Sequence, residues 1–336
     1  MTLQIIWFVL VVVLLAGYSI LDGFDLGIGM LTPFVTRSET EKRVLFNAVG
    51  PFWDGNEVWL VTGGGALFAA FPPVYATVFS GFYLPLMLVL FALIFRAVAL
   101  EFRSLEPERR RLWEWAFALG SAVPSLLYGV ALGNLLQGIP LDLRGDYIGG
   151  FFTLLRPFPL LLGILSVLAF LMQGSAYGAL RATGELRSRL IRVHRTTRYF
   201  LIVLLAVAVV VGAFLVPGAV YRFLPWLFVA LTIAAWAAGR VALKHHRDGA
   251  GFLFSSMVVA GMWGIMAASQ FPLLVRASNV PTRGLGITGA SSSQLTLRVM
   301  LIIAGVGMPI VIAYTIWVYR MFRGRITPES LEDGSA

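Results

Sequence analysis

The chain of 336 residues contains no cysteine, only three histidines and few charged side chains. The absence of cysteine excludes disulfide bonds and metal sites built on thiolates. Charged residues make up 13% of the chain, whereas soluble proteins average about 25%. This deficit argues against a soluble protein.

Apolar residues make up 58% of the sequence, and the mean hydropathy is +0.84. Apolar runs recur along the chain, and each can cross about 30 Å of hydrocarbon as a helix. They predict an all-α integral membrane protein with about nine transmembrane helices. The expected spans are 4–31, 47–71, 75–102, 113–137, 153–180, 198–217, 222–243, 251–276 and 294–322. We therefore expect a single polytopic membrane domain over 1–326 and a polar cytoplasmic tail over 327–336.

Positive charges are distributed unevenly between the two ends of the expected spans. The net charge is +9, and 19 of the 26 lysines and arginines lie in alternate connections and in the C-terminal tail. Because positively charged loops stay in the cytoplasm, this pattern predicts an N-terminus outside and a C-terminus inside. It also accounts for the basic composition without a nucleic-acid partner.

Four carboxylates lie inside the first two expected spans, where a charge costs roughly 2.5–3.5 kcal/mol on insertion scales. Asp22 and Asp25 are three residues apart and share a helix face, as do Asp54 and Glu57. If the two spans are neighbours, the four acids form a ladder of depths from the cytoplasmic side. Carboxylates inside membrane proteins often relay protons, so the ladder predicts a proton pathway.

Structural explanations for the same acids remain open. The first pair could be interfacial and lie beside a packing face containing Gly23 and Gly27, whose spacing permits close helix approach. Arg96, within the third span, could be the charge partner of Asp54 or Glu57. Such pairing does not exclude a relay.

The histidines give no sign of a haem site. His194, His245 and His246 all fall in arginine-rich segments that are expected to be cytoplasmic loops. A haem in a membrane protein usually needs a buried histidine. We therefore expect no haem ligands and no metal site in this chain, and no catalytic motif is found.

Long segments of the chain resemble subunit II of cytochrome bd quinol oxidases, and the resemblance covers almost the whole sequence. The segments are Asp22–Gly29, Trp53–Leu60, Thr62–Ala70, Phe79–Tyr83, Gly129–Gly138 and Ser291–Leu297. The resemblance implies two four-helix bundles plus a peripheral helix in a bacterial cytoplasmic membrane. It also implies a partner of similar fold, subunit I, which carries two b-type haems, one d-type haem and the quinol-oxidation site.

The resemblance further implies roles for single residues in a complex that oxidises quinol, reduces O₂ to water and generates a proton gradient. In relatives the position of Asp54, with the acids matching Asp22 and Asp25, serves proton delivery. The tryptophan matching Trp59 lines a lateral oxygen channel in some members. A structural quinone or lipid and a small single-span accessory subunit are further expectations. Some relatives have an uncharged glutamine at the position of Glu57, so the local charge balance differs here.

Two other functions remain open. A proton-coupled secondary transporter would use the membrane acids to couple ions to a substrate, although no matching acidic cluster follows later in the chain. A purely structural membrane scaffold would need the acids only as partners of arginine.

Overall fold

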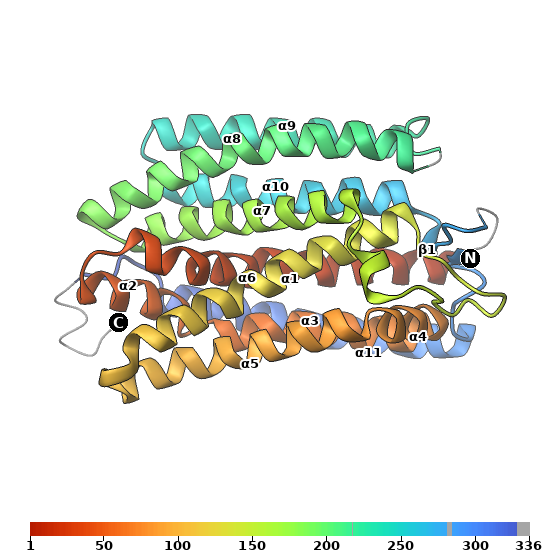
Figure 1. Ribbon diagram of the computed structural model, residues 1–336, viewed down its shortest axis with the longest axis horizontal. Coiled ribbons are helices and arrows are strands. Elements are labelled where there is room, and N and C mark those ends of the chain that lie inside the picture. Colours follow the sequence, from red (N-terminus) through yellow and green to blue (C-terminus); the bar gives the residue numbers. More distant parts are fainter. Residues whose placement is uncertain (217, 281–283, 328–336) are drawn as a thin grey trace.

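A computed structural model describes residues 1–216, 218–280 and 284–327. Long helices run side by side along the longest axis of the molecule (Figure 1). The helices are α1 (Thr2–Val35), α2 (Glu39–Val49), α3 (Trp53–Ala70), α4 (Pro72–Gly81), α5 (Tyr83–Leu105), α6 (Arg110–Gln137), α7 (Pro157–Arg181), α8 (Gly184–Leu215), α9 (Phe223–Lys244), α10 (Asp248–Gln270) and α11 (Gln294–Met321). Two short 3₁₀ helices, η1 (Pro107–Arg109) and η2 (Phe151–Leu154), and the antiparallel strands β1 (Leu273–Arg276) and β2 (Gly284–Gly286) complete the described elements.

Eight helices in the described ranges are long and apolar enough to cross a membrane, which confirms an all-α multi-pass membrane protein. They are α1, α5, α6, α7, α8, α9, α10 and α11, with α6 taken together with η1. The helix inside the remaining expected span is α3, which has 18 residues and is about 27 Å long. Its acids and glycines lower its hydropathy. The count of nine crossings and the orientation of the termini stay predictions.

Two expected spans are each divided into two helices at a proline. The span 47–71 contains a break between α2 and α3 at Pro51, and the span 75–102 contains a break at Phe82, three residues before Pro85. Proline has no N–H to donate to the carbonyl four residues earlier and its ring crowds that carbonyl, so a helix is interrupted there. The expectation of one continuous helix in each span was therefore wrong.

Two other boundaries differ from the expected spans. Helix α8 begins at Gly184 rather than at residue 198, because its arginine- and leucine-rich start consists of good helix formers. Helix α10 ends at Gln270 rather than at 276, just before Pro272, and the chain continues into β1. Pro217, where the sixth expected span ends, lies outside the described residues. The tail beyond Thr327 lies outside them as well.

The helices form two groups joined along α1, α6 and α7. Helix α1 packs against α3 and α6, and α5 packs against α6, while α7, α8, α9 and α10 form the second group. Helices α1 and α6 both contact α7 and so connect the groups (Figure 1). Helix α11 lies against α1 and α3, and none of its most apolar window is buried. This arrangement agrees with two four-helix groups and a peripheral helix.

The contact between α1 and α7 depends on glycine. A Cβ atom on Gly27 would lie 1.9 Å from the carbonyl oxygen of Phe170, and one on Gly174 would lie 2.4 Å from the backbone of Gly27. Only glycine allows the two backbones to approach this closely. Gly23 also faces Phe170, so the packing face expected at Gly23 and Gly27 is confirmed.

Candidate functional site

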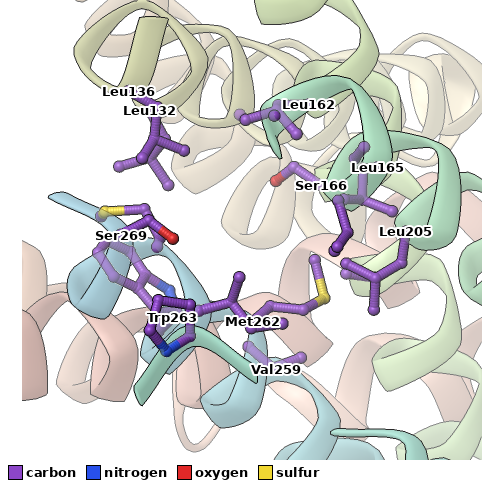
Figure 2. A pocket seen from close by; sticks show the side chains of 18 of the residues that line it. Leu132, Leu136, Leu162, Leu165, Ser166, Leu205, Val259, Met262, Trp263 and Ser269 are labelled. Atoms are coloured by element: carbon purple, nitrogen blue, oxygen red, sulfur yellow. The ribbon is translucent and has the colours of Figure 1, made fainter. Parts of the chain in front are cut away.

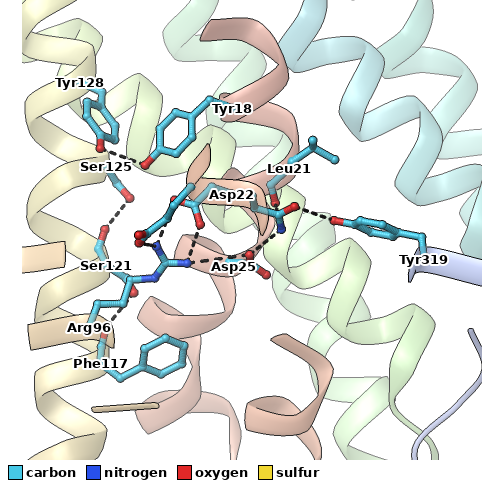
Figure 3. Close-up of polar contacts among 12 residues, drawn as sticks. Tyr18, Leu21, Asp22, Asp25, Arg96, Phe117, Ser121, Ser125, Tyr128 and Tyr319 are labelled. Atoms are coloured by element: carbon cyan, nitrogen blue, oxygen red, sulfur yellow. Dashed lines mark hydrogen bonds and ion pairs between the residues drawn. The ribbon is translucent and has the colours of Figure 1, made fainter. Parts of the chain in front are cut away.

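The membrane acids of α1 meet an arginine of α5 in a buried ion cluster. We use this name for Asp22, Asp25, Glu57 and Arg96. The side chains of Asp22, Asp25 and Arg96 are fully buried, while that of Glu57 is 25% exposed. The Arg96 guanidinium donates to both carboxylate oxygens of Asp22, at 2.5 and 3.1 Å, and to Oε1 of Glu57 at 2.9 Å. Figure 3 shows Arg96 between α1 and the serine-lined face of α6.

The ion cluster contains three carboxylates and one guanidinium. Asp25 lies farthest from the guanidinium, with its Oδ2 3.8 Å from Arg96. One oxygen of Asp25 and the Nε of Arg96 are buried without a hydrogen-bond partner in the described part of the chain. The ion cluster therefore holds more acidic than basic groups in a low-dielectric environment, where an uncompensated charge is costly.

Neutral polar side chains extend the ion cluster toward two other helices. Asn56 donates to Asp25 at 2.8 Å and to the carbonyl of Leu21 at 3.2 Å, and Tyr319 of α11 donates to Asn56 at 3.2 Å. On the opposite side, the hydroxyls of Tyr18 and Tyr128 are 2.9 Å apart and connect α1 to α6 (Figure 3). Hydrogen bonds thus join the ion cluster to α11, while the tyrosine pair lies beside it on the α6 side.

Sequence reasoning missed these four neutral residues. Asn56 stood next to the acid Glu57, and Tyr18 lies four residues before Asp22, so helical spacing could have placed both near the acids. Tyr128 and Tyr319 come from distant segments, and no local pattern marks them.

Asp54 is not part of the ion cluster. Its side chain is exposed on α3 and makes no ion pair or hydrogen bond with the described residues. Glu57, three residues later, is the member of α3 that reaches Arg96. Of the two partners expected for Arg96, the structure therefore pairs it with Glu57, and it adds Asp22 and Asp25.

Trp59 lies between α3 and α1. A Cβ atom on Gly17 would come within 2.5 Å of the Trp59 ring, so the indole packs directly on the α1 backbone. Its Nε1 is buried and has no acceptor among the described residues. Trp59 does not line the apolar cavity described next, although its neighbour Leu60 does.

An apolar cavity of about 270 Å³ lies mainly within the second helix group and reaches the first. Figure 2 shows leucines of α6, α7 and α8 facing Val259, Met262 and Trp263 of α10 across it. Tyr18, four residues before Asp22 on α1, lines the same cavity. Its lining suits a hydrocarbon chain or an isoprenoid rather than a polar ligand.

The placement expected for His194 was wrong. His194 lies on α8 and is 3% exposed, with its Nδ1 3.0 Å from the carbonyl oxygen of Met172. The extension of α8 toward its N-terminus carries this residue into the interior. His245 and His246 lie exposed after α9. Within the ranges that the structure describes, no three His, Cys, Asp or Glu side chains gather as metal ligands do.

Comparisons with known proteins cover nearly the entire chain. Residues 3–322 match the family described as cytochrome bd terminal oxidase subunit II. The chain is 39% identical to cytochrome bd-I ubiquinol oxidase subunit 2 of Escherichia coli (strain K12), covering 98% of this chain and 97% of the relative. It is 34% identical to cytochrome bd ubiquinol oxidase subunit 2 of Bacillus subtilis (strain 168), covering 97% of both.

A solved structure has the same fold. The structure of bd oxidase from Geobacillus thermodenitrificans contains a chain that matches with a TM-score of 0.77 at 16% identity. The match covers 96% of this chain and 99% of that chain.

Proposed function

Because the chain belongs to the family of cytochrome bd terminal oxidase subunit II, we propose that it is the haem-free subunit of a quinol oxidase that reduces O₂ to water in the respiratory chain. The full-length match to the E. coli ubiquinol oxidase subunit carries this proposal. The two b-type haems, the d-type haem and the quinol site belong to subunit I. This chain supports the assembly of subunit I and leads protons, and O₂, toward its haems.

Affinity purification of the tagged chain from its native membrane tests the proposal. The expected result is a second membrane subunit in the eluate, with haem bands in the reduced-minus-oxidised spectrum. A colourless protein without that partner would contradict the proposal. It would favour the transporter alternative.

The face of α3 that carries Asp54 is proposed to contact subunit I. Asp54, Val58, Val61, Gly65 and Phe68 recur at spacings of three and four residues and are all exposed. An acid facing lipid at membrane depth is costly, and open glycines permit close helix approach. Both features fit a helix face covered by another protein.

Proton delivery is proposed to run from Asp54 to the ion cluster. Asp54 precedes Glu57 by one helical turn on α3, and Glu57 is partly exposed while it contacts Arg96. Protons taken up at Asp54 would therefore reach Asp22 and Asp25 through Glu57, with water completing the hops. The excess of carboxylates over guanidinium supports this assignment.

Trp59 is proposed to border the path by which O₂ reaches the partner. Its large ring fills the space between α3 and α1, next to the exposed face of α3. A route past this ring would be apolar, as a gas path requires. This assignment rests on the position of the Trp59 ring. The apolar cavity does not support it, since that cavity is lined by Leu60 and not by Trp59.

The apolar cavity is proposed to hold a structural quinone or a lipid chain. It is lined by helices of both groups and is almost entirely apolar (Figure 2), and Tyr18 is among its lining residues. A tyrosine hydroxyl in the lining could orient the head of such a molecule. Extraction of the purified complex and mass analysis of the lipid phase tests this assignment.

The scaffold alternative has one observation in its favour. Arg96 forms ion pairs with Asp22, Asp25 and Glu57, as a purely structural neutralisation would require. Asp54 distinguishes the two explanations, because it has no such partner among the described residues. If neutralising Asp54 abolished function, its carboxylate would have a role other than stabilising the fold of this chain.

A further inference from the structure

A polar groove of about 510 Å³ lies where α1 ends and where α2 and α6 begin. Arg37, Lys42, Arg110, Arg111 and Trp115 are among the residues that line it. We call it the cytoplasmic groove, because positive charge predicts that this end of the bundle faces the cytoplasm. It is separate from the ion cluster and from the apolar cavity.

Two of the three carboxylates that line the cytoplasmic groove, Glu114 and Glu39, are paired with cations, whereas the third, Glu108, is exposed and forms no ion pair with the described residues. Glu114 accepts from Lys42 at 2.8 Å and from Arg103 at 2.9 Å. Glu39 accepts from Arg103 at 2.7 Å and lies 3.5 Å from Arg110. The four cations that line the groove, Arg37, Lys42, Arg110 and Arg111, therefore still outnumber its three acids.

Several arginine hydrogen-bond donors of the cytoplasmic groove have no acidic partner in the described part of the chain. Arg37 and Arg111 form no ion pair with any residue in the described ranges, and both are exposed. The Nε of Arg110 is buried and has no hydrogen-bond partner there. Helix α6 begins at Arg110 without an acidic residue in its first turn, and its N-terminal amides add positive potential. The groove thus offers several donors to an anion from outside the chain.

An exposed aromatic surface adjoins these donors. Phe34 is 73% exposed and Trp115 is 40% exposed, and their rings meet edge to face with centroids 5.8 Å apart. Leu112 and Leu119 lie on the same face of α6 as Trp115 and are also exposed. Trp115 belongs both to this surface and to the groove. In a membrane such a surface is covered by acyl chains, with the aromatic rings at the headgroup level.

We propose that the cytoplasmic groove binds the phosphate headgroup of an anionic phospholipid, whose acyl chains lie on the surface formed by Phe34 and Trp115. Guanidinium groups match phosphate oxygens in pairs, and the adjacent apolar surface selects a lipid over a free anion. This site does not depend on the oxidase function. It needs only the fold and the membrane boundary.

Native mass spectrometry of the detergent-purified complex, with all its subunits, tests the site. The complex is incubated with equal amounts of phosphatidylglycerol and phosphatidylcholine, and bound lipids are counted for the wild type and for the double variant Arg37→Gln/Arg111→Gln. The matched control is Arg109→Gln/Arg323→Gln, which removes two exposed charges outside the groove.

The wild type and the control should retain phosphatidylglycerol in preference to phosphatidylcholine. The double variant should bind phosphatidylglycerol roughly 30-fold more weakly, from about 5-fold per lost charge. If the double variant does not assemble, Arg111→Gln alone should give roughly the single-charge effect.

Three results would overturn the proposal. The first is equal retention of both lipids by the wild type, and the second is unchanged binding in the double or the single variant. The third is full displacement of phosphatidylglycerol by excess inorganic phosphate, which would identify a site for free anions instead.

Discussion

At the scale of single residues, Arg96 is the charge on which the ion cluster depends. It is fully buried and is the only cation within 4.0 Å of Asp22, Asp25 or Glu57 among the described residues. Removing one partner of a buried ion pair leaves the other uncompensated, which typically costs about 3–5 kcal/mol. Arg96 is therefore needed for stability whatever the acids do in function.

We expect Arg96→Leu to destabilise the protein by about 3–5 kcal/mol, because Asp22 would lose both of its guanidinium hydrogen bonds. The thermal midpoint of the purified complex, or its yield where it does not assemble, measures the effect. The control is Arg109→Gln, an exposed arginine at which the change should stay within about 0.5 kcal/mol. Equal thermal midpoints for Arg96→Leu and the control would show that the ion pairs contribute nothing.

Sequence reasoning found the members of the ion cluster but not the neutral polar residues around it. Asp22, Glu57 and Arg96 stand out because a charge in an apolar run carries a large cost. Tyr319 reaches Asn56 across 263 positions of sequence, and tertiary contacts of that kind have no local signature. The role of each acid cannot be read from position alone, because Asp54 looks equivalent to Glu57 in sequence yet faces outward.

At the scale of elements, helix α2 is fastened to α8 through Glu41. The backbone N–H of Arg37 donates to Glu41 at 2.6 Å, and the Arg189 guanidinium pairs with its other oxygen. Burial alone would raise the pKa of Glu41, but these hydrogen bonds outweigh it and lower the pKa below its ordinary value of about 4.5. The contact therefore stabilises the fold above that pH and is lost as the pH falls through the lowered pKa of the folded state.

We expect Glu41→Gln to lower the thermal midpoint at neutral pH, since the charged contact with Arg189 is absent. Below pH 4.5 the wild type and Glu41→Gln should converge as Glu41 becomes protonated. Melting curves of the purified complex between pH 7 and pH 3 would check this, because the lowered pKa of the folded state lies below 4.5. A constant difference across that range would mean that the Glu41 charge does not contribute.

The seam between α1 and α7 is the second element-scale feature that can be tested. Gly27→Ala should destabilise the protein by about 1–3 kcal/mol, because its Cβ would overlap the carbonyl of Phe170. The control is Gly249→Ala on α10, where an added Cβ meets no atom within 4 Å. A lower thermal midpoint only for Gly27→Ala supports the seam, whereas equal midpoints for both variants would argue against it.

Element boundaries show why parts of the fold escaped prediction. Pro51 and Pro85 mark the interruptions of two spans, but the apolar runs around them are long enough to conceal the breaks. His194 was placed in a loop because its neighbours are arginines, whereas the helix continues through that segment. Helix-forming residues and positive charge coincide there, and charge alone does not separate loop from helix.

At the scale of the whole molecule, apolar runs alone sufficed to predict the fold class, and in the described ranges eight helices long and apolar enough to cross a membrane follow them. The packing of α1 against α7 and the position of the apolar cavity could not be predicted, because both depend on contacts between distant helices. The exposed position of Asp54 on α3 is explained only by an assembly, because Asp54 has no partner among the described residues of this chain.

Oxygen consumption by the purified two-subunit complex carrying Asp54→Asn tests the central claim most directly. Because the Asp54 side chain makes no ion pair or hydrogen bond with the described residues, the variant should assemble with its full haem spectrum. Quinol-driven oxygen consumption should nevertheless slow by about 10²-fold, as expected when a positioned proton-transfer group is lost, while Glu101→Gln, a control at an exposed acid of α5, should leave it unchanged. Wild-type turnover in Asp54→Asn would contradict proton delivery through this subunit and leave a structural scaffold.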